Sequence, residues 1–537
     1  MASESTKGIG KVIFSSSLGT LIEWYDFYIF GMLAKTISVQ FFPEGNDTAA
    51  LLSTLAIFAA GFLVRPFGAL VFGRLGDLIG RKSTFLLTLV LMGGSTFLIG
   101  LVPGYKSIGI AAPLLVLLLR LIQGLALGGE YGGAATYVAE HAPQGRRGYF
   151  TSWIQTTATL GLFVALGIIM AVKSNMSDTA FTAEWGGWRY PFWISILLVG
   201  VSVYIRLKMQ ESPIFAKLKA EKKTSVNPLK ESFGNKGNFK MVLLALFGAV
   251  MGQGVIWYTG QFYAQSFLEN TVKIEFMQNR EILLWGIALA TPFFVVFGWL
   301  SDKVGRKWIM LTGMLLGVVF YRPIFKMFLN DTNAKEWMKD KNNLSDGTYN
   351  ATIKSDTILN KEGIRIINHK ENSWLYKDNR FKEKKSDSLV MVEGGYTLYP
   401  PLSGLGPDKI NFNDLKFALR SDSKPVYSDI ILSTSLKWKF IFLVWTMIIF
   451  VTMVYGPVAA FLVELFPTKI RYTSMSLPYH IGNGVFGGLV PFIATLLSST
   501  FTTDPLVGLW YPIGVAALCF VIGAFYLSNK IDKNVKD

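Results

Sequence analysis

The chain has 537 residues, of which 51% are hydrophobic and only 16% are charged. Soluble domains carry about 25% charged residues, so this composition excludes an ordinary soluble protein. The net charge is +16, but the basic residues gather in short loops, which argues against a nucleic-acid partner. The single cysteine, Cys519, excludes an intramolecular disulfide. The three histidines are too few and too scattered for a metal site.

Apolar runs of about 20 residues recur along the chain, and this length spans a hydrocarbon core of about 30 Å as helix. In chain order, the twelve predicted membrane-spanning segments are 12–34, 50–72, 84–104, 112–138, 149–173, 189–209, 241–268, 281–300, 309–328, 439–462, 473–497 and 507–528. Lysine and arginine cluster in alternate short loops, which predicts that both termini lie in the cytoplasm. We therefore expect an all-α polytopic membrane protein.

Two pairs of loop motifs indicate an internal duplication. "GRLGDLIGRK" (73–82) recurs 225 residues later as "GWLSDKVGRK" (298–307). "EHAPQGRR" (140–147) recurs 324 residues later as "ELFPTKIR" (464–471). A simple duplication would keep one offset, so the difference of 99 residues indicates an insertion between the second copies. Two six-helix halves are expected.

Composition locates the insertion at 330–437, which holds 17 Lys/Arg and 15 Asp/Glu. Counting spans from a cytoplasmic N-terminus puts this segment outside, between the ninth and tenth helices. Its charge does not prevent this, because long loops translocate largely regardless of charge. Alternating stretches such as "SLVMVEGGYTLYP" favour a small domain with strands over a disordered loop. The chain is predicted to divide into four parts. They are an N-terminal half (1–209), a basic cytoplasmic linker (210–240), a C-terminal half in two pieces (241–329 and 438–537) and the insertion (330–437).

The duplicated motif has residue types suited to a structural or gating role. Glycine allows a tight turn and close helix approach, and the aspartate can meet a helix N-terminus or a nearby arginine. A charged connector would explain one copy, but two copies at equivalent places indicate a shared role. The candidates are Gly73, Asp77, Gly80, Arg81, Lys82, Gly298, Asp302 and Arg306.

The duplicated motif, the twelve spans and the basic linker resemble the major facilitator superfamily. Further stretches resemble its metabolite:proton symporter family, namely "EWYDF" (23–27), "RPFG" (65–68), "RLIQGLALGGEYGGAATYVAE" (120–140), "GWRYPF" (187–192) and "ESPIF" (211–215). The resemblance covers the chain apart from the insertion. It implies a carrier of small organic acids such as citrate, 2-oxoglutarate or shikimate, or of zwitterions such as proline or betaine. The sugar-porter family is a poorer match, because the seventh helix lacks that family's glutamine-leucine-serine signature.

Glu23 and Asp26 lie three residues apart in an apolar stretch, and therefore on one helical face. Carboxylates at membrane depth usually face an internal water-filled path and mark proton or substrate sites. We therefore expect Asp26, Glu23 and Glu130 to take up and release protons. A structural ion pair with Arg65 or Arg120 is the alternative for the acids of the first helix.

Arg120, Gln123 and Glu130 share one face of the predicted helix 112–138, whereas glycines repeat every four residues on another face suited to close packing. A guanidinium matches a carboxylate, so Arg120 is expected to bind an anionic substrate together with Gln123. Arg65 is expected to be structural. The alternative for Arg120 is to neutralise the buried acids, and the alternative for Arg65 is to bind the substrate.

The other substrate-binding candidates are Tyr25, Trp257, Tyr258, Gln261, His480 and Asn483. Trp257, Tyr258 and Gln261 lie near one face of the seventh predicted helix, and His480 and Asn483 lie three apart in the eleventh. The intrinsic pKa of histidine suits a proton relay. The alternative for His480 is the commoner one, a helix histidine whose hydrogen bonds are already satisfied.

The sequence thus predicts a proton-coupled symporter that takes up a small organic acid or zwitterion by alternating access. An efflux antiporter, or a surface receptor or assembly protein acting through the insertion, remains an alternative. The chain has no phosphate-binding loop, and its acids lack the cleft of a hydrolase, so neither an enzyme nor a cofactor is expected. The expected partners are the substrate, protons, the lipid of the cell's inner membrane and an unknown extracytoplasmic partner of the insertion.

Overall fold

The computed structural model describes residues 9–79, 81–129, 135–136, 138–139, 141–143, 145–207, 228–346, 352–360, 363–391, 417–420, 425–467 and 470–529. The chain divides into two compact units. The membrane unit comprises Met1–Ser266, Ile282–Lys326 and Ile441–Asp537. The sheet unit comprises Phe267–Glu281 and Met327–Phe440. The predicted boundaries of the halves, the linker and the insertion stay predictions.

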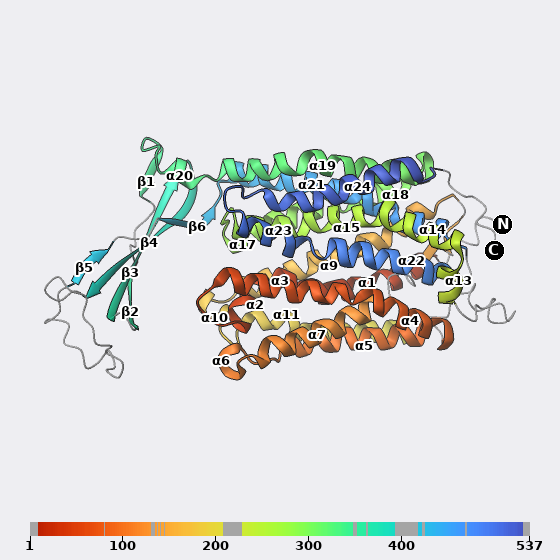
Figure 1. The fold of residues 1–537 in the computed structure, drawn as a ribbon, viewed down its shortest axis with the longest axis horizontal. Coiled ribbons are helices and arrows are strands. Elements are labelled where there is room, and N and C mark those ends of the chain that lie inside the picture. Colours follow the sequence, from red (N-terminus) through yellow and green to blue (C-terminus); the bar gives the residue numbers. More distant parts are fainter. Residues whose placement is uncertain are drawn as a thin grey trace. The chain divides into compact units, whose positions relative to one another are not determined.

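The first half of the membrane unit is built from helices that pack in pairs, with α1 against α9 and α5 against α7 (Figure 1). These helices are α1 (Ile9–Met32), α2 (Ala34–Phe41), α3 (Asp47–Leu63), α4 (Arg65–Ile79), α5 (Arg81–Ile99), α6 (Tyr105–Ile108), α7 (Ala111–Gly128), α9 (Arg147–Ser174), α10 (Asp178–Thr182), η1 (Gly187–Arg189) and α11 (Tyr190–Leu207). Arg189 donates through Nη1 to the carbonyls of Gly100 and Val102, each at 2.8 Å. It thereby satisfies two carbonyls of the turn that follows α5.

The second half is helical in the same way but contains three π-helical segments, η2, η3 and η6. Its helices are α13 (Pro228–Gly234), α14 (Lys236–Ala245), η2 (Leu246–Val250), α15 (Met251–Tyr258), η3 (Thr259–Tyr263), α16 (Ala264–Asn270), α17 (Phe276–Ala290), α18 (Pro292–Val304), α19 (Arg306–Asp331), α21 (Thr434–Leu465), α22 (Arg471–His480), η6 (Ile481–Gly487), α23 (Val490–Thr500), η7 (Val507–Leu509) and α24 (Trp510–Tyr526). π-Helical turns are rare and occur frequently at functional sites.

Nine helices of the described residues are long and apolar enough to cross a membrane. They are Asp47–Phe72, Ala111–Gly128, Arg147–Ser174, Lys236–Asn270, Phe276–Val304, Arg306–Trp337, Thr434–Leu465, Thr473–Thr500 and Val507–Tyr526. Helices α1, α5 and α11 overlap the three other predicted segments. Each predicted segment therefore contains a helix, and the count of twelve spans stays a prediction.

Between α19 and α21 the chain forms a short helix, α20 (Ala334–Trp337), and one antiparallel sheet (Figure 1). Its strands are β1 (Leu344–Asp346), β2 (Thr352–Asn360), β3 (Gly363–Tyr376), β4 (Asn379–Met391), β5 (Phe417–Arg420) and β6 (Val426–Ile431). Strands β1 and β2 pair with β3, β3 pairs with β4, and β5 and β6 pair with β4. The expected all-α class is therefore corrected to a mostly helical chain with one sheet, because residues of alternating polarity can bury one face only as strands.

The strands β3 and β4 form the long hairpin at the centre of this sheet. Tyr376 pairs with Asn379 across a two-residue turn in which Lys377 and Asp378 have φ of 46° and 65°. Such left-handed turns match the twist of the flanking strands. Trp337 of α20 stacks on Tyr376 at 5.3 Å between ring centroids, so the short helix covers this end of the sheet. Of the strand-like stretch 388–400, β4 contains 388–391, and the rest lies outside the described residues.

Within the sheet unit, β6 is bonded to the turn between α16 and α17. The N–H of Ile430 donates to the Lys273 carbonyl, and the N–H of Glu275 donates to the Ile430 carbonyl, both at 2.9 Å. Gln278 donates to the Leu432 carbonyl at 3.0 Å and accepts from the Leu432 N–H at 2.7 Å. The turn between α16 and α17, the start of α17 and the sheet therefore form one hydrogen-bonded body.

Candidate functional site

Aromatic side chains from both halves of the membrane unit meet in one cluster. Trp24 and Tyr28 lie one helical turn apart on α1, with ring centroids 5.1 Å apart, and both rings face Trp257 of α15, at 5.9 and 5.6 Å. Contacts of the same kind extend the group through the second half. We call this group the central aromatic cluster; its members are Trp24, Tyr28, Phe58, Phe62, Trp257, Tyr258, Phe262 and Tyr455.

Two buried arginines lie against this cluster. Arg65, at the start of α4, lies over the ring of Phe62 with its guanidinium carbon 4.0 Å from the centroid. Arg120 of α7 lies over the ring of Phe58 at 5.0 Å. Tyr258 interacts electrostatically with both arginines, so the two cations converge on one phenol. Aromatic faces attract cations, and a buried guanidinium can bind a carboxylate through two parallel hydrogen bonds.

Several buried polar atoms beside the cluster have no hydrogen-bond partner among the described residues. They are Nε1 of Trp257, both amide atoms of Gln261 and both ring nitrogens of His480. Gln261 lies one turn beyond Trp257, and His480 interacts electrostatically with Arg65. Buried polar groups in native proteins are nearly always bonded, so this group of exceptions is a candidate place for a water molecule or a ligand to supply the bonds.

Asp26 lies on a different side of α1. Residues 24 and 26 are about 160° apart around a helix, so the Asp26 carboxylate points away from the face that carries Trp24. A Cβ added at Gly93 of α5 would lie 3.1 Å from Asp26 Oδ2 and would clash with Val199 of α11. Both carboxylate oxygens are buried and unbonded within the described part of the chain. Among described residues, the alternative ion pair with Arg65 or Arg120 is therefore not formed.

Three other predicted substrate residues have protein partners. Gln123 accepts from Arg120 and donates to the Asp26 carbonyl at 3.1 Å and to Thr96 Oγ1 at 2.7 Å. Tyr25 donates to the Pro191 carbonyl at 2.8 Å. Asn483 exchanges two hydrogen bonds with Gln253. These contacts connect neighbouring helices, and the expected substrate role of Gln123, Tyr25 and Asn483 stays a prediction.

Some of the predicted residues cannot be compared with the structure. Glu130 and Gly80 lie outside the described residues, as do the side chains of Glu23, Asp77, Arg81 and Lys82, and the surroundings of Gly73. For the duplicated motif, only the second copy is therefore described.

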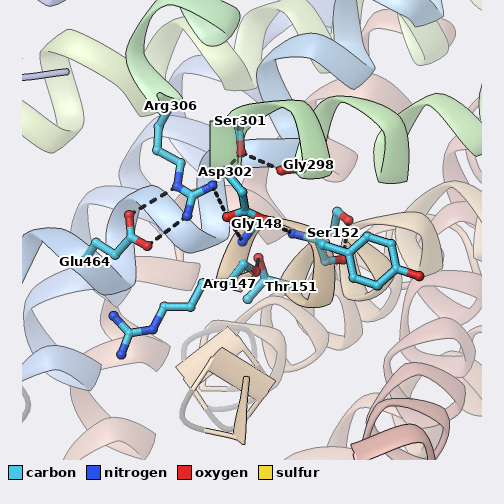
Figure 2. Close-up of polar contacts among 10 residues, drawn as sticks. Arg147, Gly148, Thr151, Ser152, Gly298, Ser301, Asp302, Arg306 and Glu464 are labelled. Carbon is cyan, nitrogen blue, oxygen red and sulfur yellow. Dashed lines mark hydrogen bonds and ion pairs between the residues drawn. The ribbon is translucent and has the colours of Figure 1, made fainter. Parts of the chain in front are cut away.

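That second copy joins the two halves at the contact between α9 and α18 (Figure 2). The Asp302 carboxylate accepts from the backbone N–H groups of Gly148 and Tyr149, both at 2.8 Å. These groups belong to the first turn of α9, whose N–H groups have no intrahelical acceptor. Asp302 thus caps a helix of the other half, and its negative charge suits the positive end of that helix dipole.

Arg306 links this cap to α21. Its guanidinium lies between two carboxylates, with Nη1 2.8 Å from Asp302 Oδ1 and Nη2 2.8 Å from Glu464 Oε1 (Figure 2). Nε bonds the second oxygen of Glu464 at 3.1 Å, so the pair is bidentate. Gly298 and Gly148 allow the close approach, because a Cβ on either would clash with the facing helix. These contacts suit the structural or gating role expected of Gly298, Asp302 and Arg306. We call the set of contacts between the two halves the α9–α18 latch; its members are Gly148, Tyr149, Gly298, Asp302, Arg306 and Glu464.

Sequence reasoning missed several of these residues. The spacing of Trp24 and Tyr28, one turn apart beside Asp26, is a signal that could have indicated an aromatic face. Glu464 was visible as the acid of the second repeated loop. Tyr455 and Phe262 carry no comparable signal, because isolated aromatic residues in membrane helices are common.

The fold is that of a known class of transporter. A crystal structure of a double tryptophan mutant of XylE superimposes with a TM-score of 0.63 at 13% identity, covering 98% of this chain and 97% of that chain. Another structure is described as the major facilitator superfamily proton:xylose symporter XylE. At this identity the likeness shows the fold alone, which is the major facilitator fold. The family model "Sugar (and other) transporter" matches residues 12–232.

Sequence relatives narrow the class. "Inner membrane metabolite transport protein YhjE" of Escherichia coli is 38% identical over 60% of this chain and 73% of that protein. "Alpha-ketoglutarate permease" of the same organism is 36% identical over 61% of this chain and 74% of that protein. A "Putative metabolite transport protein" of Haemophilus influenzae is 30% identical over 97% of this chain and 95% of its own length.

The chain belongs to the metabolite:proton symporter family of the major facilitator superfamily. It is a membrane transporter and not an enzyme.

Proposed function

We propose that this transporter takes up a small organic acid or zwitterion together with protons. The observation that carries the proposal is the convergence of two buried arginines on the central aromatic cluster, beside polar atoms with no partner among the described residues. The arginines suit a carboxylate, and the rings suit the apolar body of a small solute. The relative named as an α-ketoglutarate permease supports a carboxylate substrate.

In this proposal Arg120, Trp257, Tyr258, Gln261 and His480 bind substrate. Arg65, which lies against the same rings, joins them rather than serving only as a structural cation. Gln123, Tyr25 and Asn483 hold the helices that carry these residues.

Asp26 is the proposed proton carrier, with Glu23 and Glu130 as further candidates. A charged carboxylate buried without a partner is strongly unfavourable, whereas the protonated acid is tolerated. Protonation would therefore lower the free energy of the conformation in which Asp26 is buried. Deprotonation requires a conformation in which water reaches it, which links the proton to alternating access.

The two six-helix halves rock about the central aromatic cluster, and the α9–α18 latch closes one end of the path. The charge pattern of the loops assigns that end to the cytoplasm of an inner membrane, together with both termini and the linker 210–240. The segment 330–437 would then lie outside.

The test is uptake into proteoliposomes of labelled di- and tricarboxylates, shikimate, proline and betaine, with and without an inward proton gradient. Accumulation of one class only when the gradient is present supports symport. Accumulation that ignores the gradient would remove the proton from the mechanism. Proton-driven loss of a preloaded solute would favour the efflux antiporter.

The receptor alternative rests on the compactness of the sheet unit as a separate body. It predicts that shortening the insertion abolishes function while substitutions at Arg120 or Trp257 do not. The opposite result supports the transporter.

A further inference from the structure

Two amide side chains join helix α15 to the π-helical segment η6 inside the second half. Gln253 donates through Nε2 to Asn483 Oδ1 at 3.1 Å, and Asn483 donates through Nδ2 to Gln253 Oε1 at 2.8 Å. Both side chains are buried. Each amide thus donates one hydrogen bond to the other amide and accepts one from it.

The two backbones touch where the amides meet. A Cβ added at Gly254 would lie 3.1 Å from the Asn483 Cα and would clash with the Gly482 carbonyl. A Cβ at Gly487 would lie 3.0 Å from the Gly254 carbonyl. Glycine is therefore required on both segments for this close approach. The amide pair then fixes how α15 and η6 are aligned along each other.

The pair lies beside two residues of the proposed substrate site. Gln253 is one helical turn before Trp257 on α15, and Asn483 is three residues after His480. Trp257 Nε1 and the His480 nitrogens have no hydrogen-bond partner in the described part of the chain. A second polar contact lies next to Trp257. The hydroxyls of Tyr455 and Tyr479 are 2.9 Å apart, and the ring of Tyr455 packs on that of Trp257.

We infer that Gln253 and Asn483 are positioning residues, whose reciprocal amide bonds hold Trp257 and His480 at the separation at which one substrate molecule contacts both. This inference rests on the proposed function. Neither amide needs to touch the substrate for this role, because the two amides bond to each other and Asn483 also donates to the Tyr479 carbonyl at 3.3 Å. The aromatic face of α15 and the histidine of α22 then move as one body when the halves rock.

The test is a swap of the two side chains. Gln253→Asn and Asn483→Gln each change the reach of one amide, so each single variant loses the reciprocal bonds, whereas the double variant restores their combined length. We expect KM for uptake to rise about tenfold in each single variant with little change in the maximal rate, because substrate binding is weakened in both the ground and the transition state. The double variant is expected to return KM to within about threefold of wild type.

The control is Gln278→Asn, which shortens an amide that bonds to Leu432 in the sheet unit and should leave KM unchanged. Thermal unfolding without substrate is measured on all variants. The inference is overturned if the single variants lose thermal stability, the double variant regains it, and KM equals that of wild type in all three variants. In that case the pair is only structural. The inference is also overturned if neither KM nor stability changes.

Failure of the proposed function is recognisable separately. If wild type accumulates none of the solutes, that function fails. The thermal stabilities of the two single variants and the double variant then still test whether Gln253 and Asn483 act as a pair. Recovery of stability in the double variant supports the pair, whereas a loss equal to the sum of the two single losses overturns it.

Discussion

The α9–α18 latch and the central aromatic cluster both bury arginine where the two halves meet, but they surround it differently. In the latch, Arg306 is paired with Asp302 and Glu464, and Asp302 also caps α9. In the cluster, Arg65 and Arg120 lie over aromatic rings, and neighbouring polar atoms such as those of Gln261 have no partner in the residues described. Buried charge whose partners come from the protein stabilises one conformation, whereas the unbonded polar groups are the basis on which we propose a substrate site.

The largest expected effect breaks the latch. Arg306→Ala leaves the carboxylates of Asp302 and Glu464 buried without their cation, and removing one partner of a buried pair costs about 3–5 kcal/mol. We expect a lower unfolding temperature in detergent and a strong loss of uptake. Lys303→Ala, an exposed neighbour on α18, is the control and should change little. An unchanged unfolding temperature in Arg306→Ala would show that the latch does not stabilise this conformation.

Asp26→Asn tests whether Asp26 couples proton movement to transport without being needed for substrate binding. The amide removes a buried carboxylate that lacks a partner among described residues, so the unfolding temperature should not fall and substrate binding should survive. Accumulation driven by a proton gradient should disappear, while exchange of labelled for unlabelled substrate continues. Uptake and exchange assays on the same proteoliposomes measure both. Accumulation equal to wild type would exclude Asp26 as the carrier and direct attention to Glu130.

Gln261→Leu tests the cluster directly. Its amide has no partner in the described chain, so replacing it with an apolar residue of similar size should leave stability unchanged or improve it. The affinity for substrate should fall about tenfold, corresponding to one or two lost hydrogen bonds. Thr259→Val is the matched control, because its hydroxyl bonds the Val255 carbonyl of its own helix. Equal affinity in Gln261→Leu and wild type would remove Gln261 from the site.

The smallest effect concerns an ion pair at the surface. Arg322 lies 2.8 Å from Asp504, and both side chains are more than a third exposed. The N–H of Leu506 and then Arg322 hold the pKa of Asp504 below its usual value, so the contribution is present at neutral pH and is lost as pH falls through that lowered pKa. Solvent screening limits it to about 0–1 kcal/mol. The difference in unfolding free energy between Arg322→Ala and wild type should be smaller at pH 3 than at pH 7.

Arg322 also contacts an aromatic ring. It lies over the Trp510 ring at 5.1 Å as well as beside Asp504, so it links α19 to the turn before α24 rather than only meeting the membrane surface. Its partners lie more than 180 residues further along the chain, so the local sequence does not indicate them.

The sequence by itself determined the membrane class, the family and a helix within each predicted segment. These follow from local quantities, since a run of about 20 apolar residues can bury its backbone polar groups in lipid only as helix. It also indicated strands within 330–437, where alternating polarity replaces the apolar runs. The pairing of those strands and the bond between β6 and the α16–α17 turn are non-local and were not predicted.

Only the tertiary structure decided which buried polar residues have partners. Helical spacing put Gln123 beside Arg120 and Asn483 near His480, but it could not show that the Asp26 carbonyl or Gln253 would meet them, because those groups are 97 and 230 residues away in the chain. The same spacing placed Glu23 and Asp26 on one face without showing what that face meets. Periodicity fixes the direction of a side chain about its own helix, whereas the neighbour it meets depends on how the helices pack.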